Sequence, residues 1–231
     1  LCLTFRGFQK VCRILWCLKI LYSLLNLILL LVLPFIFLIR GAVYLHVHNQ
    51  LNPLLCLLGG MVATSILLVI YFSLIHGRFT GRFGDMGSLK RRSLLALLLV
   101  GGYCMYGLLY LSNANAKQDE VRKEYTSLHP ILRVGVSTVL FVDRSLMITD
   151  ADRQPEDYRK MGLKTARRSL HYRQKNGFVH AMDIRTNGRS EFRNNLLQLY
   201  FKLMGFNTLR HGGTGDHLHI SLKSHDHPGA I

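Results

Sequence analysis

The stretch TGDHLHISL, residues 214–222, lies close to the end of the chain. Its apolar residues recur with the period of two that is typical of a β-strand, so His217 and His219 are expected on one face. Two imidazoles about 7 Å apart along a strand can converge on one metal ion or one substrate. The alternative is the polar outer face of an ordinary strand, and the rest of the sequence bears on this choice.

The residues around this strand predict a helix and two further strands. SEFRNNLLQLYFKLMG, residues 190–205, has apolar residues at helical spacing, a serine suited to the N-cap and a glycine suited to the stop. GFVHAMDIR, residues 177–185, alternates as a strand, and FNTLRHGG, residues 206–213, forms a second strand beside HLHISL across a Gly-rich turn.

Two more elements complete the predicted domain. RVGVSTVLFV, residues 133–142, and SLMITDA, residues 145–151, are expected to form a hairpin that turns at Asp143 and Arg144. A basic helix is expected to follow from Pro155 towards Arg168. The second half of the chain therefore predicts an α+β domain with a small antiparallel sheet and flanking helices.

The first 112 residues have a different composition, with nearly all the long apolar runs and one acidic residue, Asp85. Three runs reach the length of about 20 residues that crosses a bilayer. These predicted transmembrane helices cover about residues 20–39, 54–75 and 93–112. The predicted divisions are a membrane anchor at 1–112, a linker at 113–127, a domain at 128–223 and a tail at 224–231.

The charges predict both the partners and the orientation. Lysines and arginines precede the first run and separate the second run from the third, whereas only Arg40 lies between the first and the second. The N-terminus is therefore expected in the cytoplasm and the C-terminal domain outside it. The net charge of +16 suits anionic lipid and an acidic polymer, and without a nucleic-acid-binding motif no nucleic acid is expected as partner.

The predicted domain offers nitrogen and oxygen ligands for a metal ion. All five cysteines precede residue 113, so a metal there would use His, Asp or Glu. Catalytic zinc takes three such ligands and leaves one position for water, and His171, Asp183 and His219 can supply them. His180 is the rival ligand, but in a regular strand it faces away from Asp183, which favours a packed position or one beside the ligands.

Four motifs appear in a recognisable order: ITDADR (148–153), SLH (169–171), HAMDI (180–184) and DHLHIS (216–221). Together they resemble the zinc D-alanyl-D-alanine peptidases, which share a fold with lysostaphin-type endopeptidases and the hedgehog signalling domain. The resemblance covers about residues 128–223. The spacing between the SLH and HAMDI motifs is wider than in that family, which implies an inserted loop at 172–177.

The resemblance implies a role for each matched residue. The implied zinc ligands are His171, Asp183 and His219. Asp216 would be the general base that takes a proton from the water and returns it to the leaving amine. His217 would stabilise the oxyanion or orient a ligand. Arg153 would pair with a substrate carboxylate or support the oxyanion, and a structural salt bridge is its alternative reading.

These expectations combine into one leading function. The chain is expected to be a zinc peptidase anchored in a bacterial cytoplasmic membrane. It would cleave peptidoglycan stem peptides or crosslinks next to D-alanine outside that membrane, as a carboxypeptidase or an endopeptidase. The alternative is a non-catalytic module for cell-wall binding or assembly within a membrane complex. Its expected partners are a peptidoglycan peptide, the lipid bilayer and proteins of such a complex.

Overall fold

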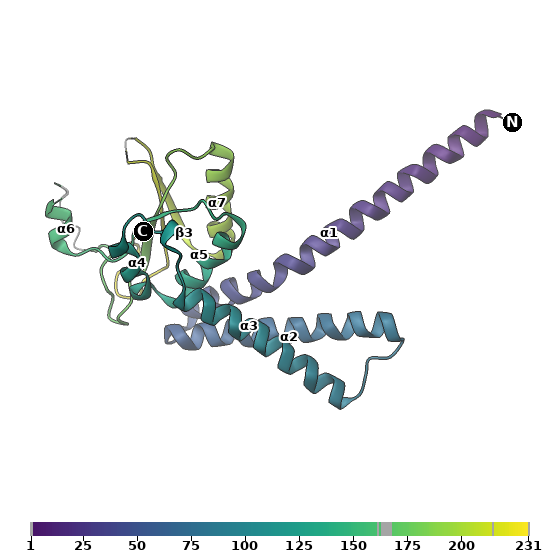
Figure 1. Ribbon diagram of the computed structural model, residues 1–231, viewed down its shortest axis with the longest axis horizontal. Coiled ribbons are helices and arrows are strands. Elements are labelled where there is room, and N and C mark those ends of the chain that lie inside the picture. Colours follow the sequence, from purple (N-terminus) through teal and green to yellow (C-terminus); the bar gives the residue numbers. More distant parts are fainter. Residues whose placement is uncertain (1, 161, 163–167, 214, 231) are drawn as a thin grey trace.

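Three long helices precede a small α+β domain in the computed structural model of this chain (Figure 1). The structure describes residues 2–160, 162, 168–213 and 215–230, with side chains from residue 15 onward apart from that of Lys160. The helices are α1 (Cys2–Asn49), α2 (Pro53–Thr80) and α3 (Met86–Leu109). All three are long and apolar enough to cross a membrane.

The three helices converge at the end next to the domain and spread apart at the other end (Figure 1). Small residues allow α1 and α2 to approach each other closely at the convergence. A Cβ atom added at Gly60 of α2 would collide with the carbonyl oxygen of Leu38 in α1, and one at Gly41 would touch the α-carbon of Gly60. This close backbone contact is the packing that membrane helices commonly use.

Helix α5 (Pro130–Val142) joins the domain to the three helices. The predicted strand at 133–142 was therefore wrong, although its β-branched residues favour a strand. Pro130 stands at the first helical position and the His129 side chain caps the helix, so both start signals are present. Because residues 130–138 are buried on all sides, they lack the polar face by which periodicity separates helix from strand.

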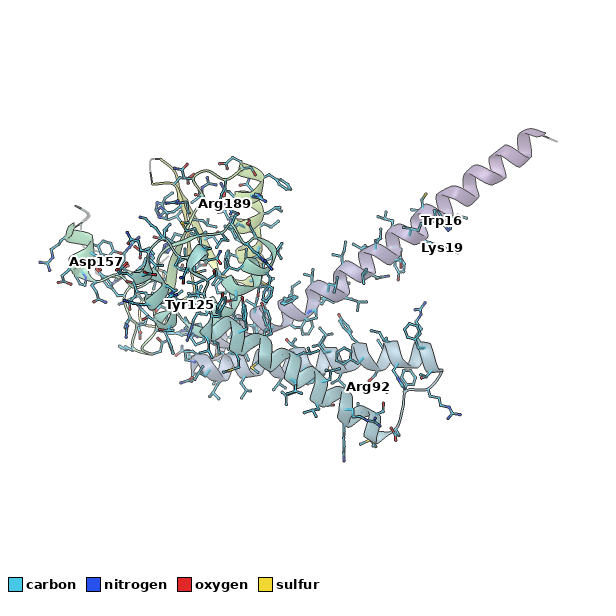
Figure 2. The ribbon with its side chains drawn as sticks, viewed as in Figure 1. Trp16, Lys19, Arg92, Tyr125, Asp157 and Arg189 are labelled. Atoms are coloured by element: carbon cyan, nitrogen blue, oxygen red, sulfur yellow. The ribbon has the colours of Figure 1, made fainter. Side chains whose placement is uncertain are left out.

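The segment before α5 packs on the domain and holds it to α3. It contains the short helices η1 (Asn113–Asn115), α4 (Asp119–Glu124) and η2 (Tyr125–Ser127). Tyr125 lies where the domain meets the helices (Figure 2), and its hydroxyl donates to the carbonyl of Gly107 at 2.8 Å. The predicted linker at 113–127 is thus folded onto the domain.

The sheet contains four antiparallel strands in the order β1-β2-β4-β3. They are β1 (Ile148–Asp150), β2 (Ala181–Arg185), β3 (Asn207–His211) and β4 (His217–Ser221). The terminal hairpin of β3 and β4 was predicted correctly, whereas β1 pairs with β2 and not with residues 133–142.

Helix α7 (Glu191–Met204) has the ends that the sequence predicts. The Ser190 side chain accepts a hydrogen bond from the backbone of Arg193, and Gly205 ends the helix with a φ of 94°. Glycine adopts such a left-handed conformation without the steric cost that a Cβ atom adds. Helix α6 (Pro155–Lys160) is the described part of the predicted basic helix, whose remainder towards Arg168 lies largely outside the described residues.

The two faces of the sheet differ in character. Met182, Ile184, Leu218 and Ile220 are fully buried in the domain core. Asp183 lies between Met182 and Ile184 in β2, so its side chain projects from the other face, and its partner in the ladder is His219. The polar face of the two central strands therefore carries the candidate site.

Candidate metal centre

Three predicted ligands meet on the polar face of the sheet. Asp183 and His219 face each other from β2 and β4, and His171 arrives from the loop before β2. The Nδ1 atom of His219 lies 2.9 Å from Oδ1 of Asp183 and 3.2 Å from Nε2 of His171. The third side of this triangle, from Nε2 of His171 to Oδ1 of Asp183, is 3.4 Å.

This triangle has the size that a zinc ion requires. Zinc bonds to nitrogen and oxygen are about 2.0–2.1 Å long, so two ligand atoms of a tetrahedral site lie about 3.3 Å apart. Two imidazole nitrogens and one carboxylate oxygen are also the ligand types of catalytic zinc sites. His171, Asp183 and His219, all buried, can thus hold a metal ion together.

Contacts behind the ligands orient them for this task. The Nδ1–H of His171 donates to the carbonyl of Ala151 at 3.1 Å, which leaves the lone pair of Nε2 directed at the centre. Asp150 adds a carboxylate 3.5 Å from the same Nδ1. Such outer hydrogen bonds fix the tautomer and the ring orientation of metal-binding histidines.

Arg153 holds the carboxylate of the site in place. Its guanidinium donates to Oδ2 of Asp183 at 2.6 Å and to Oδ2 of Asp150 at 2.7 Å. Burial by itself would raise the pKa of Asp183, but hydrogen bonds from His171 and His219 and the charge of Arg153 hold that pKa well below its usual value. The salt-bridge reading of Arg153 is the arrangement present here.

Asp150 has a place in this site that sequence reasoning missed. It lies inside the ITDADR motif, three residues before Arg153, and it ends β1 beside β2. The i to i+3 spacing of an acid and an arginine is a weak signal. The signal becomes informative only once β1 is known to pair with the strand that carries Asp183.

His217 adds a free ring nitrogen at the edge of the centre. Its Nδ1–H donates to the carbonyl of Gly215 at 2.6 Å, so in the neutral ring Nε2 carries the lone pair. This Nε2 lies 3.7 Å from Oδ2 of Asp183. His217 and His219 share one face of β4, as their parity predicts, and the ring of His211 stacks on that of His217 at 4.7 Å.

The predicted general base, Asp216, forms a salt bridge with Arg210. Both of its carboxylate oxygens accept from Arg210, at 2.6 and 2.8 Å. The hydrogen bond from Arg210 is the main cause that lowers the pKa of Asp216 to about 2. A carboxylate of such low pKa is a weak proton acceptor. Asp216 lines the same cleft as Asp183. Within that cleft the Asp216 carboxylate is bound by Arg210, whereas Nε2 of His217 lies next to the carboxylate of Asp183.

The centre lies between two hollows in the surface. One has a volume of about 640 Å³, and its lining includes Lys117, Arg185 and Asn187. The other, of about 460 Å³, is lined by Tyr158 and Leu209 among others. Arg153, Asp183 and His217 line both hollows, so the two hollows adjoin at the centre.

The rival ligand His180 lies apart from this centre. It belongs to a second buried group with His46 of α1 and His129, the cap of α5. His46 donates through Nε2 to the carbonyl of Lys223, while the ring of His225 donates to the carbonyl of His46. The predicted tail is thus packed against α1 through residue 225.

Hydrogen bonds assign the protons in this second group. Nδ1 of His129 accepts from the backbone of Ile131, and Nε2 of His180 accepts from the amide of Asn176. Each ring must then carry its proton on the nitrogen that faces the group. Two inward N–H groups and one inward lone pair on His46 match a hydrogen-bonded water better than a metal ion. Sequence reasoning missed His46 because it lies in a membrane-type helix.

Comparisons with known proteins add no relative. No protein-family model, no curated protein and no solved structure matches the chain.

Proposed function

We propose that this chain is a membrane-anchored zinc peptidase that hydrolyses peptidoglycan stem peptides or crosslinks next to D-alanine. The observation that carries the proposal is the triangle of donor atoms from His171, Asp183 and His219, with sides of 2.9 to 3.4 Å. Three of the four sequence motifs supply these residues, in the order of the zinc D-alanyl-D-alanine peptidases. We infer that the domain shares their fold.

The chemistry follows from the residues around the triangle. A bound zinc ion supplies a Lewis acid and lowers the pKa of a water to about 7. Arg153 keeps Asp183 ionised and correctly oriented. The lone pair on Nε2 of His217 is placed to accept a proton at the centre or to bind a substrate oxygen. The predicted base Asp216 would need to leave Arg210 for the same step.

The larger hollow suits an acidic peptide. Lys117 and Arg185 line it together with Asn187. Arg153 is already paired with two carboxylates, so Lys117 and Arg185 are the better candidates for a substrate carboxylate. Stem peptides offer such carboxylates, and the positive-inside pattern would place the domain on the side of the cell wall.

The test measures zinc and hydrolysis on the same preparations of the full chain in detergent. We expect one equivalent of zinc and release of D-alanine from peptides that end in D-alanyl-D-alanine. His171→Ala and His219→Ala should lose both, whereas His48→Ala, an exposed histidine of α1, should lose neither. A reconstituted chain that binds no zinc would overturn the proposal.

A non-catalytic cell-wall module is the second candidate. The observation in its favour is that Asp216 and Arg153, two of the three predicted catalytic residues, are engaged in salt bridges. On this reading the chain would bind zinc and peptidoglycan without cleaving it. Hydrolysis that disappears in His217→Gln while zinc is retained would exclude this candidate.

A further inference from the structure

Helix α7 exposes an apolar stripe that no part of the described domain covers. Phe192, Leu196, Leu199 and Leu203 have exposed fractions of 72%, 49%, 50% and 59%. At 100° per residue they fall within an arc of about 60°. The residues that pack into the core, Leu197, Phe201 and Met204, lie on the opposite side of the helix. Helix α7 thus has two apolar faces, which a helix on a water-exposed surface does not need.

Helix α7 stands at the edge of the domain that faces the long free part of α1 (Figure 1). The C-terminal end of α7 contacts α1, since the side chain of Arg40 donates to the carbonyl of Leu203 at 2.7 Å. A Cβ added to Gly205 would lie 3.0 Å from a methyl group of Val43, so the helix end touches α1. The stripe therefore has a fixed position relative to a membrane-type helix.

An apolar groove of about 540 Å³ continues from this position along α1. Leu31 and Val32 of α1 form one wall, and Leu196 and Tyr200 of α7 line the groove as well. Leu31 lies inside the predicted span at 20–39, about 12 Å along the helix from its end. The groove is thus continuous with the part of α1 that lipid would surround, at the depth of acyl chains.

Basic side chains flank the apolar stripe. Arg193 and Lys202 of α7 are exposed, and Arg193 lines the groove. An apolar stripe with basic residues at its borders is typical of helices that lie in the headgroup region of a membrane. Anionic phospholipid headgroups complement these charges.

We propose that α7 is an interfacial membrane helix whose apolar stripe inserts among lipid acyl chains, with an acyl chain in the adjoining groove. The metal centre then faces away from the lipid, because it lies on the opposite face of the sheet. Gln198 of α7 bonds to Thr208 of β3, whereas Leu209 and His211 of the same strand line the centre. This inference concerns attachment and does not rest on the proposed hydrolysis.

The test places a tryptophan on the stripe of the full chain in anionic phospholipid nanodiscs. Trp16 is the only tryptophan of the chain and lies far out on α1 (Figure 2), so Trp16→Phe gives a silent background. Leu199→Trp and the milder Phe192→Trp report on the stripe. Leu209→Trp, on an exposed position of the opposite sheet face, is the matched control.

We expect brominated acyl chains to quench most of the emission of both stripe tryptophans, and iodide in the water to quench little. The Leu209→Trp control should respond to iodide and not to brominated lipid. Quenching of the stripe by iodide would overturn the proposal in favour of a solvent-exposed helix. Protection from both quenchers would overturn it in favour of a protein partner or a second copy of this chain.

Discussion

The buried histidine group makes the stability of the domain depend on pH. Burial lowers the pKa of His180 to about 4, with a further contribution from His46, and burial also holds the pKa of His129 well below its usual value. In the unfolded chain a histidine has a pKa of about 6.5. The folded state thus binds fewer protons than the unfolded state between these two values.

The sign of the effect follows from this difference. Above pH 6.5 His180 is neutral in both the folded and the unfolded state, so its titration does not lower the free energy of unfolding. As the pH falls from 6.5 towards 4, His180 is protonated in the unfolded state but stays neutral in the folded state. The free energy of unfolding therefore decreases. For this one histidine the loss is about 2 kcal/mol at pH 5 and approaches roughly 3 kcal/mol below pH 4.

The assay is urea unfolding of the full chain in mild detergent between pH 7.5 and 4.5, followed by near-ultraviolet circular dichroism. His180→Gln keeps a neutral polar side chain. Between pH 7.5 and pH 5 its free energy of unfolding should fall by about 2 kcal/mol less than that of the unchanged chain. His48→Gln, at an exposed position, should keep the pH dependence of the unchanged chain. Equal slopes for His180→Gln and the unchanged chain would refute the reasoning, because the two chains differ only at His180.

Three further predictions test the packing and the site. Gly60→Ala should separate α1 from α2 and lower stability in detergent by about 1–3 kcal/mol, whereas Gly102→Ala, which meets open space, should be tolerated in the same thermal unfolding assay. Arg153→Leu should weaken zinc binding about 10- to 100-fold in a chelator competition, because it removes the partner of the ligand carboxylate. His217→Gln should lower kcat more than Asp216→Asn does at full zinc occupancy, and the reverse order would return the role of base to Asp216.

The sequence predicts those features that local rules determine. Three apolar runs of bilayer length predict helices without knowledge of what they contact. The ends of α7 follow from Ser190 and Gly205, which act on their own backbone. Parity along a strand places His217 and His219 on one face, and the motif order supplies Asp183 and His171 as their neighbours.

Features that depend on distant partners could not be predicted in this way. Residues 130–138 are buried where α5 packs against α1, α2, α3 and α7, and the β-branched residues of this run taken alone favour a strand. Asp150 joins the site only through the pairing of β1 with β2. The group of His46, His129 and His180 unites a membrane-type helix, a helix cap and a strand start, and no local pattern connects these three segments.

The loop between His171 and Asp183 closes on itself, so both residues reach the candidate metal centre although they are twelve positions apart. The backbone of Gln174 donates to Phe178 at 2.9 Å, and that of Gly177, with a φ of 81°, donates back to Gln174 at 2.8 Å. The chain therefore returns to the sheet close to where it left. The same loop carries Asn176, which holds the ring of His180. One turn thus connects His171, the first candidate ligand, to the buried histidine group at α1.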